Sequence, residues 1–284
     1  MKKIVLIVFI VYLTIITYSV KTINFIKPHH ELHSGSKTHI VAHRGYSSLA
    51  RENSLKSIEL ANNSDCVDML EIDVRMTKDN VLILFHNNKI LKIGDKKFNV
   101  SNTTYDIIKN FRLIDNIELP YYEDNKYFEF VSIPTLEEAL EKIDKQVIID
   151  IKYNNNIKKL NKKLLTIIDE FDNVILQSTN LNGLNDLNQR NKLLKCQFII
   201  DSKFDYLNIP NYLYGVSVKH TLLDVVELKK IIDKGIKLFV WTINNIETYK
   251  EVLSNLKSIS RIAYYITDYP EMLCTYDKEK FLTL

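Results

Sequence analysis

The chain has 284 residues, of which 46% are apolar, and its formal net charge is +3. Lys2 and Lys3 supply two of these charges, so the rest of the chain is close to neutral and offers no excess of positive charge to a polyanion. The sequence carries no DNA- or RNA-binding motif, and its three cysteines, Cys66, Cys196 and Cys274, form neither a disulfide framework nor a metal-ligand spacing.

The N-terminal segment differs from the rest of the chain. Ile4 to Val20 is uncharged and mostly apolar, and it follows Lys2 and Lys3. Its length of about 17 residues is near the lower limit for a membrane-spanning helix, and no small-x-small cleavage site follows it. We therefore expect an uncleaved signal anchor over residues 1–21 and a linker over 22–37, with the remaining domain on the non-cytosolic side of a membrane. A cleaved signal peptide and a secreted protein are the alternative.

Residues 38–284 alternate short, β-rich apolar runs with amphipathic helical patterns. The apolar runs predict eight strands, at 38–43, 67–74, 146–152, 174–178, 195–200, 214–218, 238–242 and 263–267. Apolar strands that alternate with helices are typical of parallel strands covered by helices. Eight such units in about 245 residues predict a closed (β/α)8 TIM barrel. An open doubly wound sheet is the alternative, but no glycine-rich phosphate loop follows any strand.

One apolar run breaks this alternation. Residues 81–86 follow the second strand after a short polar turn at Lys78, Asp79 and Asn80, too soon for a parallel crossover, so the two runs are predicted to form a β-hairpin. With the turn centred there, His86 is expected opposite Glu71, at the mouth of the barrel. Residues 87–132 show no strong periodicity and predict an insertion, either a lid or a small subdomain.

Polar side chains occur at strand ends where a packed barrel would carry apolar ones. They are His43 and Arg44 after the first strand, Glu71 and Asp73 on one face of the second, Asp150 and Lys152 on one face of the third, Trp241 in the seventh, and Thr267 and Asp268 at the end of the eighth. Because barrel enzymes carry their active sites at the carboxyl ends of the strands, most of these side chains and His86 are expected to meet there.

This set of residues suits phosphodiester chemistry. Three carboxylates on rigid strands, Glu71, Asp73 and Asp150, can bind a hard divalent cation such as Ca²⁺ or Mg²⁺. Arg44 and Lys152 can bind phosphate oxygens, and two histidines can act as general acid and general base. Each residue taken alone has an ordinary structural explanation, so the inference rests on their joint occurrence at strand ends. A serine triad is disfavoured because no GxSxG motif is present.

The ordered motifs resemble those of the glycerophosphodiester phosphodiesterases, a family of the phosphatidylinositol phosphodiesterase-like TIM-barrel superfamily. AHRGYSSLARENSLKSIELA is similar to the family's first signature and LEIDVRMTKDNVLILFH to its second. IPTLEEAL, IIDIK, VILQS, VWTIN and ITDYP follow in the family's order, over about residues 38–273. The resemblance implies a (β/α)8 barrel and metal-dependent hydrolysis of glycerophosphodiesters to glycerol 3-phosphate and an alcohol.

The resemblance also implies a role for each site residue. His43 and His86 would be the acid–base pair, Arg44 and Lys152 would bind phosphate, Glu71, Asp73 and Asp150 would ligate the metal ion, and Glu52 and Trp241 would support the site. The sequence departs from the family pattern at Asp150 (usually Glu), at Asn87 (usually an acid), at Thr179 (usually Phe) and in SRIAYYITD, which lacks the usual glycine.

Two other functions stay open from the sequence. A lysophospholipase D of the same fold would suit a membrane anchor and the aromatic residues of the insertion, among them Phe111, Tyr121 and Phe130. A catalytically inactive barrel that serves as a binding module is the second. The expected partners are a small glycerophosphodiester or lysophospholipid substrate and a membrane contacted through the N-terminal segment, with no nucleic acid.

Overall fold

The computed structural model describes residues 38–91, 97–111, 131–154, 156–202, 209–259 and 263–282. Within this part of the chain, no helix is both long enough and apolar enough to cross a membrane. The prediction of a membrane-anchored protein with its main domain on the non-cytosolic side is therefore corrected and is not carried further. Residues 1–21 and 22–37, the expected anchor and linker, lie outside the described residues.

Eight parallel strands form a closed ring. In chain order they are β1 (His39–Ala42), β2 (Met69–Met76), β6 (Gln146–Ile151), β7 (Val174–Ser178), β8 (Cys196–Ile200), β9 (Gly215–Lys219), β10 (Lys237–Trp241) and β11 (Tyr264–Thr267). They pair in the order β1-β11-β10-β9-β8-β7-β6-β2, and pairing of β1 with β2 closes the ring. The predicted (β/α)8 TIM barrel is confirmed, with every strand within about two residues of its predicted range.

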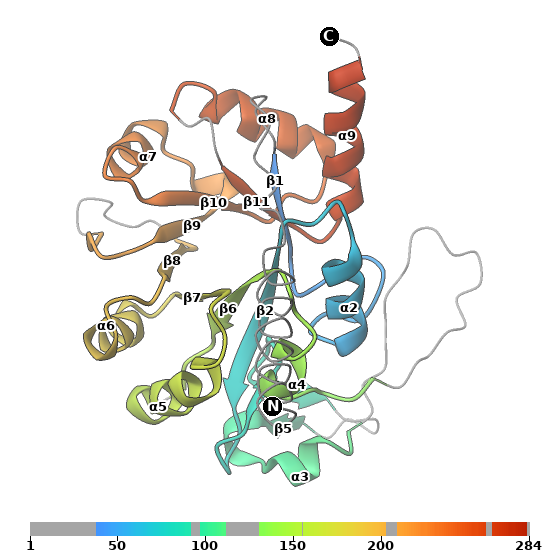
Figure 1. Ribbon diagram of the computed structural model, residues 1–284, viewed down its shortest axis with the longest axis vertical. Coiled ribbons are helices and arrows are strands. Elements are labelled where there is room, and N and C mark those ends of the chain that lie inside the picture. The colour runs from blue at the N-terminus through green and yellow to red at the C-terminus, as the bar shows by residue number, and fades with distance from the viewer. Residues whose placement is uncertain are drawn as a thin grey trace, which may run out of the picture. The chain divides into compact units, whose positions relative to one another are not determined.

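Helices cover the outside of the ring (Figure 1). They are α2 (Leu55–Asn63), α4 (Leu136–Leu140), α5 (Ile157–Ile168), α6 (Leu181–Arg190), α7 (Val225–Ile232), α8 (Ile246–Leu256) and α9 (Pro270–Leu282), with a 3₁₀ turn, η3 (His220–Leu222), before α7. Polar side chains begin several of them: Ser54 accepts a hydrogen bond from the backbone of Ser57, and Thr135 and Glu138 form a capping box.

Alternation along the strands divides the core into two layers. One set of buried side chains packs under the helices, and a smaller set, which includes Val41, Met69, Ile148 and Phe239, packs inside the ring. The inward positions further along β2 and β6 are polar instead of apolar. The barrel is therefore filled with apolar side chains toward one end and carries its acidic residues toward the carboxyl ends of the strands.

The predicted hairpin is present, with a different register. Strand β3 (Leu82–Leu84) pairs antiparallel with β2, Val74 opposite Leu84, after a turn that the Thr77 N–H closes on the Val81 carbonyl. Asn80 adopts φ 67°, in the left-handed region that asparagine tolerates. The centre of the turn lies half a residue further along the chain than predicted, and β3 ends at Leu84. His86 therefore lies beyond the paired strands and not opposite Glu71.

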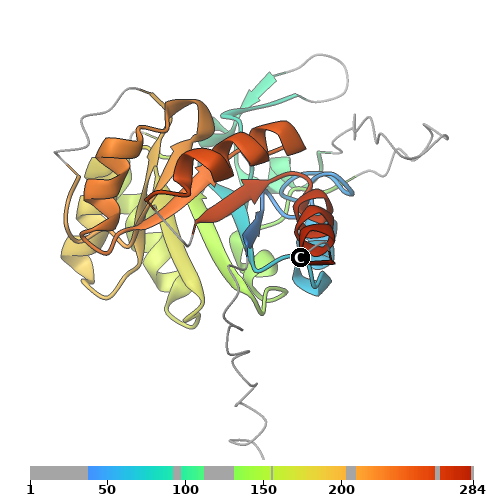
Figure 2. The same ribbon diagram turned by 90° about the horizontal axis from the view of Figure 1, so that it is seen from above.

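The insertion expected at 87–132 contains a small folded unit in its described part. It comprises the antiparallel pair β4 (Lys89–Leu91) and β5 (Lys97–Asn99), the 3₁₀ turn η1 (Val100–Asn102) and α3 (Tyr105–Ile108). Its apolar side chains, such as Ile90, Ile108 and Phe111, pack with Ile83 and Ile133 in a separate cluster. Figure 2 shows this β-hairpin, in teal, at one edge of the molecule. Residues 112–130 lie outside the described residues.

Two cysteines are linked across the length of the chain. Cys66, before β2, forms a disulfide with Cys274 in α9, with a sequence separation of 208 residues and Cα atoms 5.5 Å apart, and Cys196 is free and buried in β8. The expectation that the cysteines form no disulfide framework is therefore wrong, because residues distant in sequence meet only when the barrel closes.

Breaking this disulfide is expected to lower the stability of the folded chain. A crosslink over such a long loop restricts the unfolded chain, so the Cys274→Ala variant should lose about 2–5 kcal/mol of free energy of unfolding. Urea denaturation with and without dithiothreitol measures this loss. Reductant should lower the midpoint of the wild type and leave that of the variant unchanged; equal midpoints for the oxidised wild type and the variant would contradict the linkage.

Candidate active site

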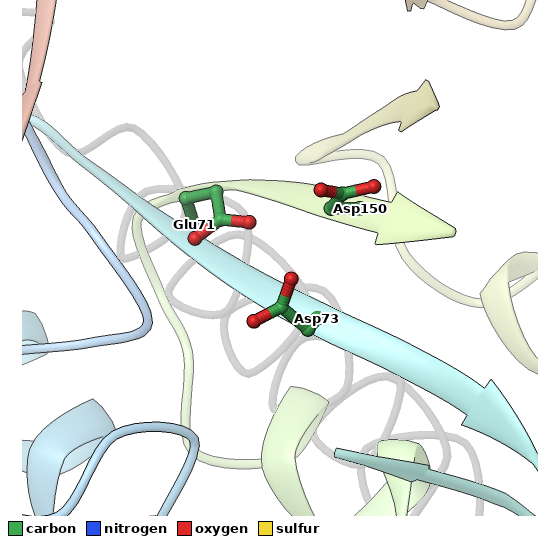
Figure 3. A group of neighbouring side chains, drawn as sticks. All are labelled: Glu71, Asp73 and Asp150. Atoms are coloured by element: carbon green, nitrogen blue, oxygen red, sulfur yellow. The ribbon is translucent and has the colours of Figure 1, made fainter. Parts of the chain in front are cut away.

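Three carboxylates gather on two neighbouring strands. Glu71 and Asp73 lie on the inward face of β2, and Asp150, the register partner of Asp73, lies on β6 (Figure 3). One oxygen of each can be chosen so that all lie within 4.8 Å of one another, and all three residues are buried. Although Asp150 is one methylene shorter than the glutamate usual in the family, its carboxylate reaches the cluster because β6 pairs directly with β2.

Burial and mutual repulsion set the charges of the cluster. Burial raises the pKa of Glu71 to about 8, and the charge of Asp73 adds to the shift. Burial also raises the pKa of Asp150, to about 6, against the charge of Lys152. For Asp73, the cations Lys152 and Arg44 outweigh burial and lower its pKa. The cluster is therefore an oxygen-rich site in which Asp73 is held ionised and burial favours the protonated form of Glu71.

Two cations border these acids. Lys152 Nζ lies 2.6 Å from Asp150 Oδ2 and 3.0 Å from Asp73 Oδ1. Arg44 Nε lies 3.1 Å from Asp73 Oδ2, and Arg44 Nη1 lies 2.6 Å from Glu52 Oε2, so Glu52 orients the guanidinium from the first βα loop. Both cations line the same cavity as the acids, where their free N–H groups can meet an anion.

The loop after β1 is folded tightly around this site. Arg44 has φ 58° and Gly45 φ 78°, and a Cβ at Gly45 would lie 2.6 Å from Ser57 Oγ, so glycine is required there. The Arg44 backbone N–H donates a 3.0 Å hydrogen bond to Glu71 Oε2. The backbone conformation of this turn thus ties the cation to the acidic cluster.

His43 is held by an aspartate that the sequence analysis gave no role. His43 Nδ1 lies 2.6 Å from Asp268 Oδ1, and Asp268 also accepts hydrogen bonds from Ser47 and Asn244. These bonds outweigh burial and lower the pKa of Asp268 to about 2, so the carboxylate is ionised and Nδ1 carries the proton. The other nitrogen, Nε2, lies 3.9 Å from Glu71 Oε2.

The environment of His43 favours its protonated form. Burial lowers the pKa of His43, but the hydrogen bond to Asp268 and the charges of Glu71 and Asp268 outweigh this, and the pKa is raised above its ordinary value. An imidazole in such surroundings is a stronger base than free imidazole. Asp268 follows β11, and two sequence signals indicated its place here: its position at a strand end and its occurrence in the ITDYP motif.

Asn53 is a second residue that the sequence analysis did not select. It is buried, with φ 57°, and its side-chain amide donates to Asp73 Oδ2 while its oxygen accepts from the Asp73 backbone N–H, both at 2.9 Å. These two hydrogen bonds fix the orientation of the Asp73 carboxylate. In the sequence, Asn53 was indicated by the Glu52-Asn53 pair within the first signature motif.

His86 lines the same cavity from the end of the hairpin. The cavity measures about 170 Å³, and its walls also include His43, Trp241 and Thr179. Burial lowers the pKa of His86, which the charge of Asp73 opposes, and Asn87 Oδ1 lies 3.3 Å from its Nδ1. Trp241 is anchored by a hydrogen bond that its Nε1 donates to the Ser217 carbonyl, 3.1 Å away. All the residues selected from the sequence thus lie in or beside one cavity.

The donor set of the acidic cluster fits a hard divalent cation. Three buried carboxylate oxygens on adjacent strands provide the ligand type that Ca²⁺ and Mg²⁺ prefer. Burial is the main cause of the raised pKa values of Glu71 and Asp150, and repulsion from the charge of Asp73 adds to both. A bound ion would remove that repulsion.

Comparisons with known proteins agree on one family. The model of the glycerophosphoryl diester phosphodiesterase family matches residues 43–271. A glycerophosphodiester phosphodiesterase from Caldanaerobacter subterraneus subsp. tengcongensis is 27% identical over 249 residues, which cover 84% of this chain and 96% of the relative.

Solved structures of this family have the same fold. The chain matches a Thermotoga maritima glycerophosphodiester phosphodiesterase with a TM-score of 0.64 and 25% identity, covering 87% of this chain and 100% of the other. It matches an Oleispira antarctica phosphodiesterase in complex with the product sn-glycerol-3-phosphate with a TM-score of 0.72 and 19% identity, covering 84% and 96%. The chain belongs to the glycerophosphoryl diester phosphodiesterase family and is a phosphoric diester hydrolase.

Proposed function

We propose that the chain hydrolyses glycerophosphodiesters to glycerol 3-phosphate and an alcohol by acid–base catalysis with His43 and His86. The observation that carries this proposal is the meeting of two histidines, two cations and three buried carboxylates around one cavity of about 170 Å³. A cavity of this size suits a glycerophosphate group. Family membership supports the same substrate class, and the Oleispira relative was solved with sn-glycerol-3-phosphate as its product.

Arg44 and Lys152 bind the non-bridging oxygens of the scissile phosphate. The ion held by Glu71, Asp73 and Asp150 would act as a Lewis acid toward a phosphoryl oxygen. Arg44 is kept in place by Glu52, which forms an ion pair with it. Both cations remain charged at neutral pH, so they stabilise the negative charge that develops on the phosphoryl oxygens.

His43, whose raised pKa makes it the stronger base of the two histidines, accepts the proton of the attacking hydroxyl. His86, whose lowered pKa makes its protonated form the stronger acid, donates a proton to the departing oxygen. Asp268 fixes the Nδ1–H tautomer of His43, which leaves Nε2 free to accept a proton. Attack by water breaks the phosphorus–oxygen bond to the alcohol in one step. Attack by the neighbouring glycerol 2-hydroxyl gives a cyclic phosphate, which water then opens with the histidine roles reversed. Trp241 forms one wall of the cavity.

The lipid alternative rests on aromatic residues of the insertion. Tyr121 and Phe130 lie outside the described residues. Phe111 is buried in the cluster of the small unit and packs on Phe98, so it does not face a substrate. No described contact therefore favours a lysophospholipid over a water-soluble diester.

The substrate class is tested by direct comparison of two substrates. With Ca²⁺ or Mg²⁺ present, the purified chain should release glycerol 3-phosphate from glycerophosphoglycerol with a kcat/KM at least tenfold above that for lysophosphatidylcholine. Enzymatic measurement of glycerol 3-phosphate, and of choline for the lipid, gives both rates. A preference for the lipid would identify a lysophospholipase D instead. Background rates on both substrates, equal to those of His43→Ala, would indicate an inactive barrel.

A further inference from the structure

A second cavity adjoins the catalytic one. It measures about 550 Å³ and lies where β2 extends beyond the barrel, between η1 and the loop that joins β6 to α5. Residue contacts link β2 with η1, and Figure 1 shows β2 running out toward the part of the chain that holds β5 and α3. Lys152 lines both cavities. We call the second cavity the basic groove.

The side chains on the inward face of β2 change from acidic to basic where the strand reaches the basic groove. Arg75 follows Glu71 and Asp73 on the same face of the strand, and it is only partly exposed. Its Nε donates a 2.8 Å hydrogen bond to the carbonyl of His86. Lys152 extends the inward row of β6 in the same way. The side chains of Arg75 and Lys152 therefore lie where the catalytic cavity meets the basic groove.

Two further cations line the outer part of the basic groove. Lys78 lies in the turn between β2 and β3, and Lys159 lies near the start of α5; both are exposed. Among the described side chains that line the groove, none is a carboxylate, and several are asparagines. Asp79, the neighbour of Lys78, directs its carboxylate to Thr77 Oγ1 (2.6 Å) and the Tyr105 N–H (2.9 Å). The groove thus combines positive charge with amide hydrogen-bonding groups.

The position of His86 indicates which part of the substrate enters the groove. In the proposed function, on which this inference rests, His86 protonates the departing alcohol, so the alcohol must lie on the side of His86. That side is bordered by Arg75, which holds the His86 carbonyl and lines the groove. The groove is accordingly where the alcohol extends when the scissile phosphate lies between Arg44 and Lys152.

We propose that the basic groove binds the alcohol part of the substrate and selects alcohols that carry a second anionic group, such as a phosphate. A phosphate there would meet the cations Arg75, Lys78 and Lys159 together with amide donors. A quaternary ammonium group, as in choline, would meet positive charge instead of the aromatic rings or carboxylates that bind such groups.

Glycerophosphoglycerol and its terminal phosphomonoester test this selectivity, because they differ only in one phosphate on the alcohol. Loss of the diester resonance in ³¹P NMR measures hydrolysis of both. The wild type should show a kcat/KM about tenfold higher for the phosphorylated diester at low ionic strength, with the ratio falling toward one in about 0.5 M salt as the charges are screened. An equal or lower kcat/KM for the phosphorylated diester would overturn the proposal.

Variants locate the selectivity on the groove. The double variant Lys78→Gln/Lys159→Gln should lose most of the preference, through a higher KM for the phosphorylated diester. Lys162→Gln is the matched control, since Lys162 is exposed on the same helix, α5, but does not line the groove, and it should keep the wild-type ratio. A double variant that also keeps the wild-type ratio would exclude the groove as the origin of the selectivity.

Binding separates failure of this inference from failure of the proposed function. If neither diester is hydrolysed, the proposed function fails, and calorimetric titration of the same two compounds then decides the role of the groove. Tighter binding of the phosphorylated diester to the wild type than to Lys78→Gln/Lys159→Gln would support an anion site. Equal binding of both compounds to the wild type would exclude one.

Discussion

Replacing His43 with alanine is expected to lower kcat for glycerophosphodiesters by a factor on the order of 10³, and His86→Ala should have an effect of similar size. General acid and general base catalysis each contribute roughly 10²- to 10⁴-fold. Both side chains line the cavity that holds the acidic cluster and the two cations. KM should change less than kcat, because Arg44 and Lys152 still bind the phosphate. Steady-state kinetics with glycerophosphoglycerol measures both constants.

Asp268→Asn distinguishes positioning of His43 from mere packing. The carboxylate of Asp268 raises the pKa of His43 by a hydrogen bond and by its charge. Its loss should therefore lower kcat by about 10²-fold. It should also move the limb of the pH–rate profile that reports His43 to lower pH. A variant that is folded, as judged by circular dichroism, and that keeps both the wild-type rate and profile would remove Asp268 from the mechanism.

Removing the divalent ion is the second change with a large expected effect. Chelation with EDTA should reduce hydrolysis to the level of Glu71→Gln, on the order of 10²-fold or more below the wild type, and added Ca²⁺ or Mg²⁺ should restore it only in the wild type. The reason is the buried set of Glu71, Asp73 and Asp150, whose oxygens lie within 4.8 Å of one another. Activity after dialysis against EDTA, with each ion added back, measures this dependence.

Thermal denaturation supplies a readout that does not depend on activity. A ligand that binds only the folded chain raises Tm, so the active ion should raise Tm of the wild type and leave that of Glu71→Gln almost unchanged. Since the carboxyl of Glu71 has a pKa of about 8 without an ion, protons compete with the metal. The shift in Tm should therefore grow as the pH rises toward 8. An equal shift in Glu71→Gln, or full activity in EDTA, would contradict the metal site.

The barrel was predictable because its signal is local. Each strand is a short apolar run such as QVIIDI, buried on both faces, and each is followed by a helical pattern. The hairpin was predictable for a similar reason, since the turn at Lys78 to Asn80 is too short for a crossover. Its register was not, because the position of the turn depends on the left-handed conformation at Asn80.

Residues that meet only because the barrel closes were harder to predict from the sequence. His43 and Asp268 are separated by 225 positions and meet because β1 pairs with β11. Cys66 and Cys274 meet for the same reason. Asn53 orients Asp73 through a loop conformation that no periodicity predicts. The basic groove combines Arg75 on β2 with elements of the insertion, which show no regular pattern in the sequence.

The central claim is that one cavity, with His43 and His86 beside an acidic ion site, hydrolyses glycerophosphodiesters. Release of glycerol 3-phosphate from glycerophosphoglycerol by the wild type and by His43→Ala, each with Ca²⁺ or Mg²⁺, tests it most directly. The account predicts metal-dependent release by the wild type and a rate on the order of 10³-fold lower for the variant. Equal rates for the two proteins with either ion would contradict it.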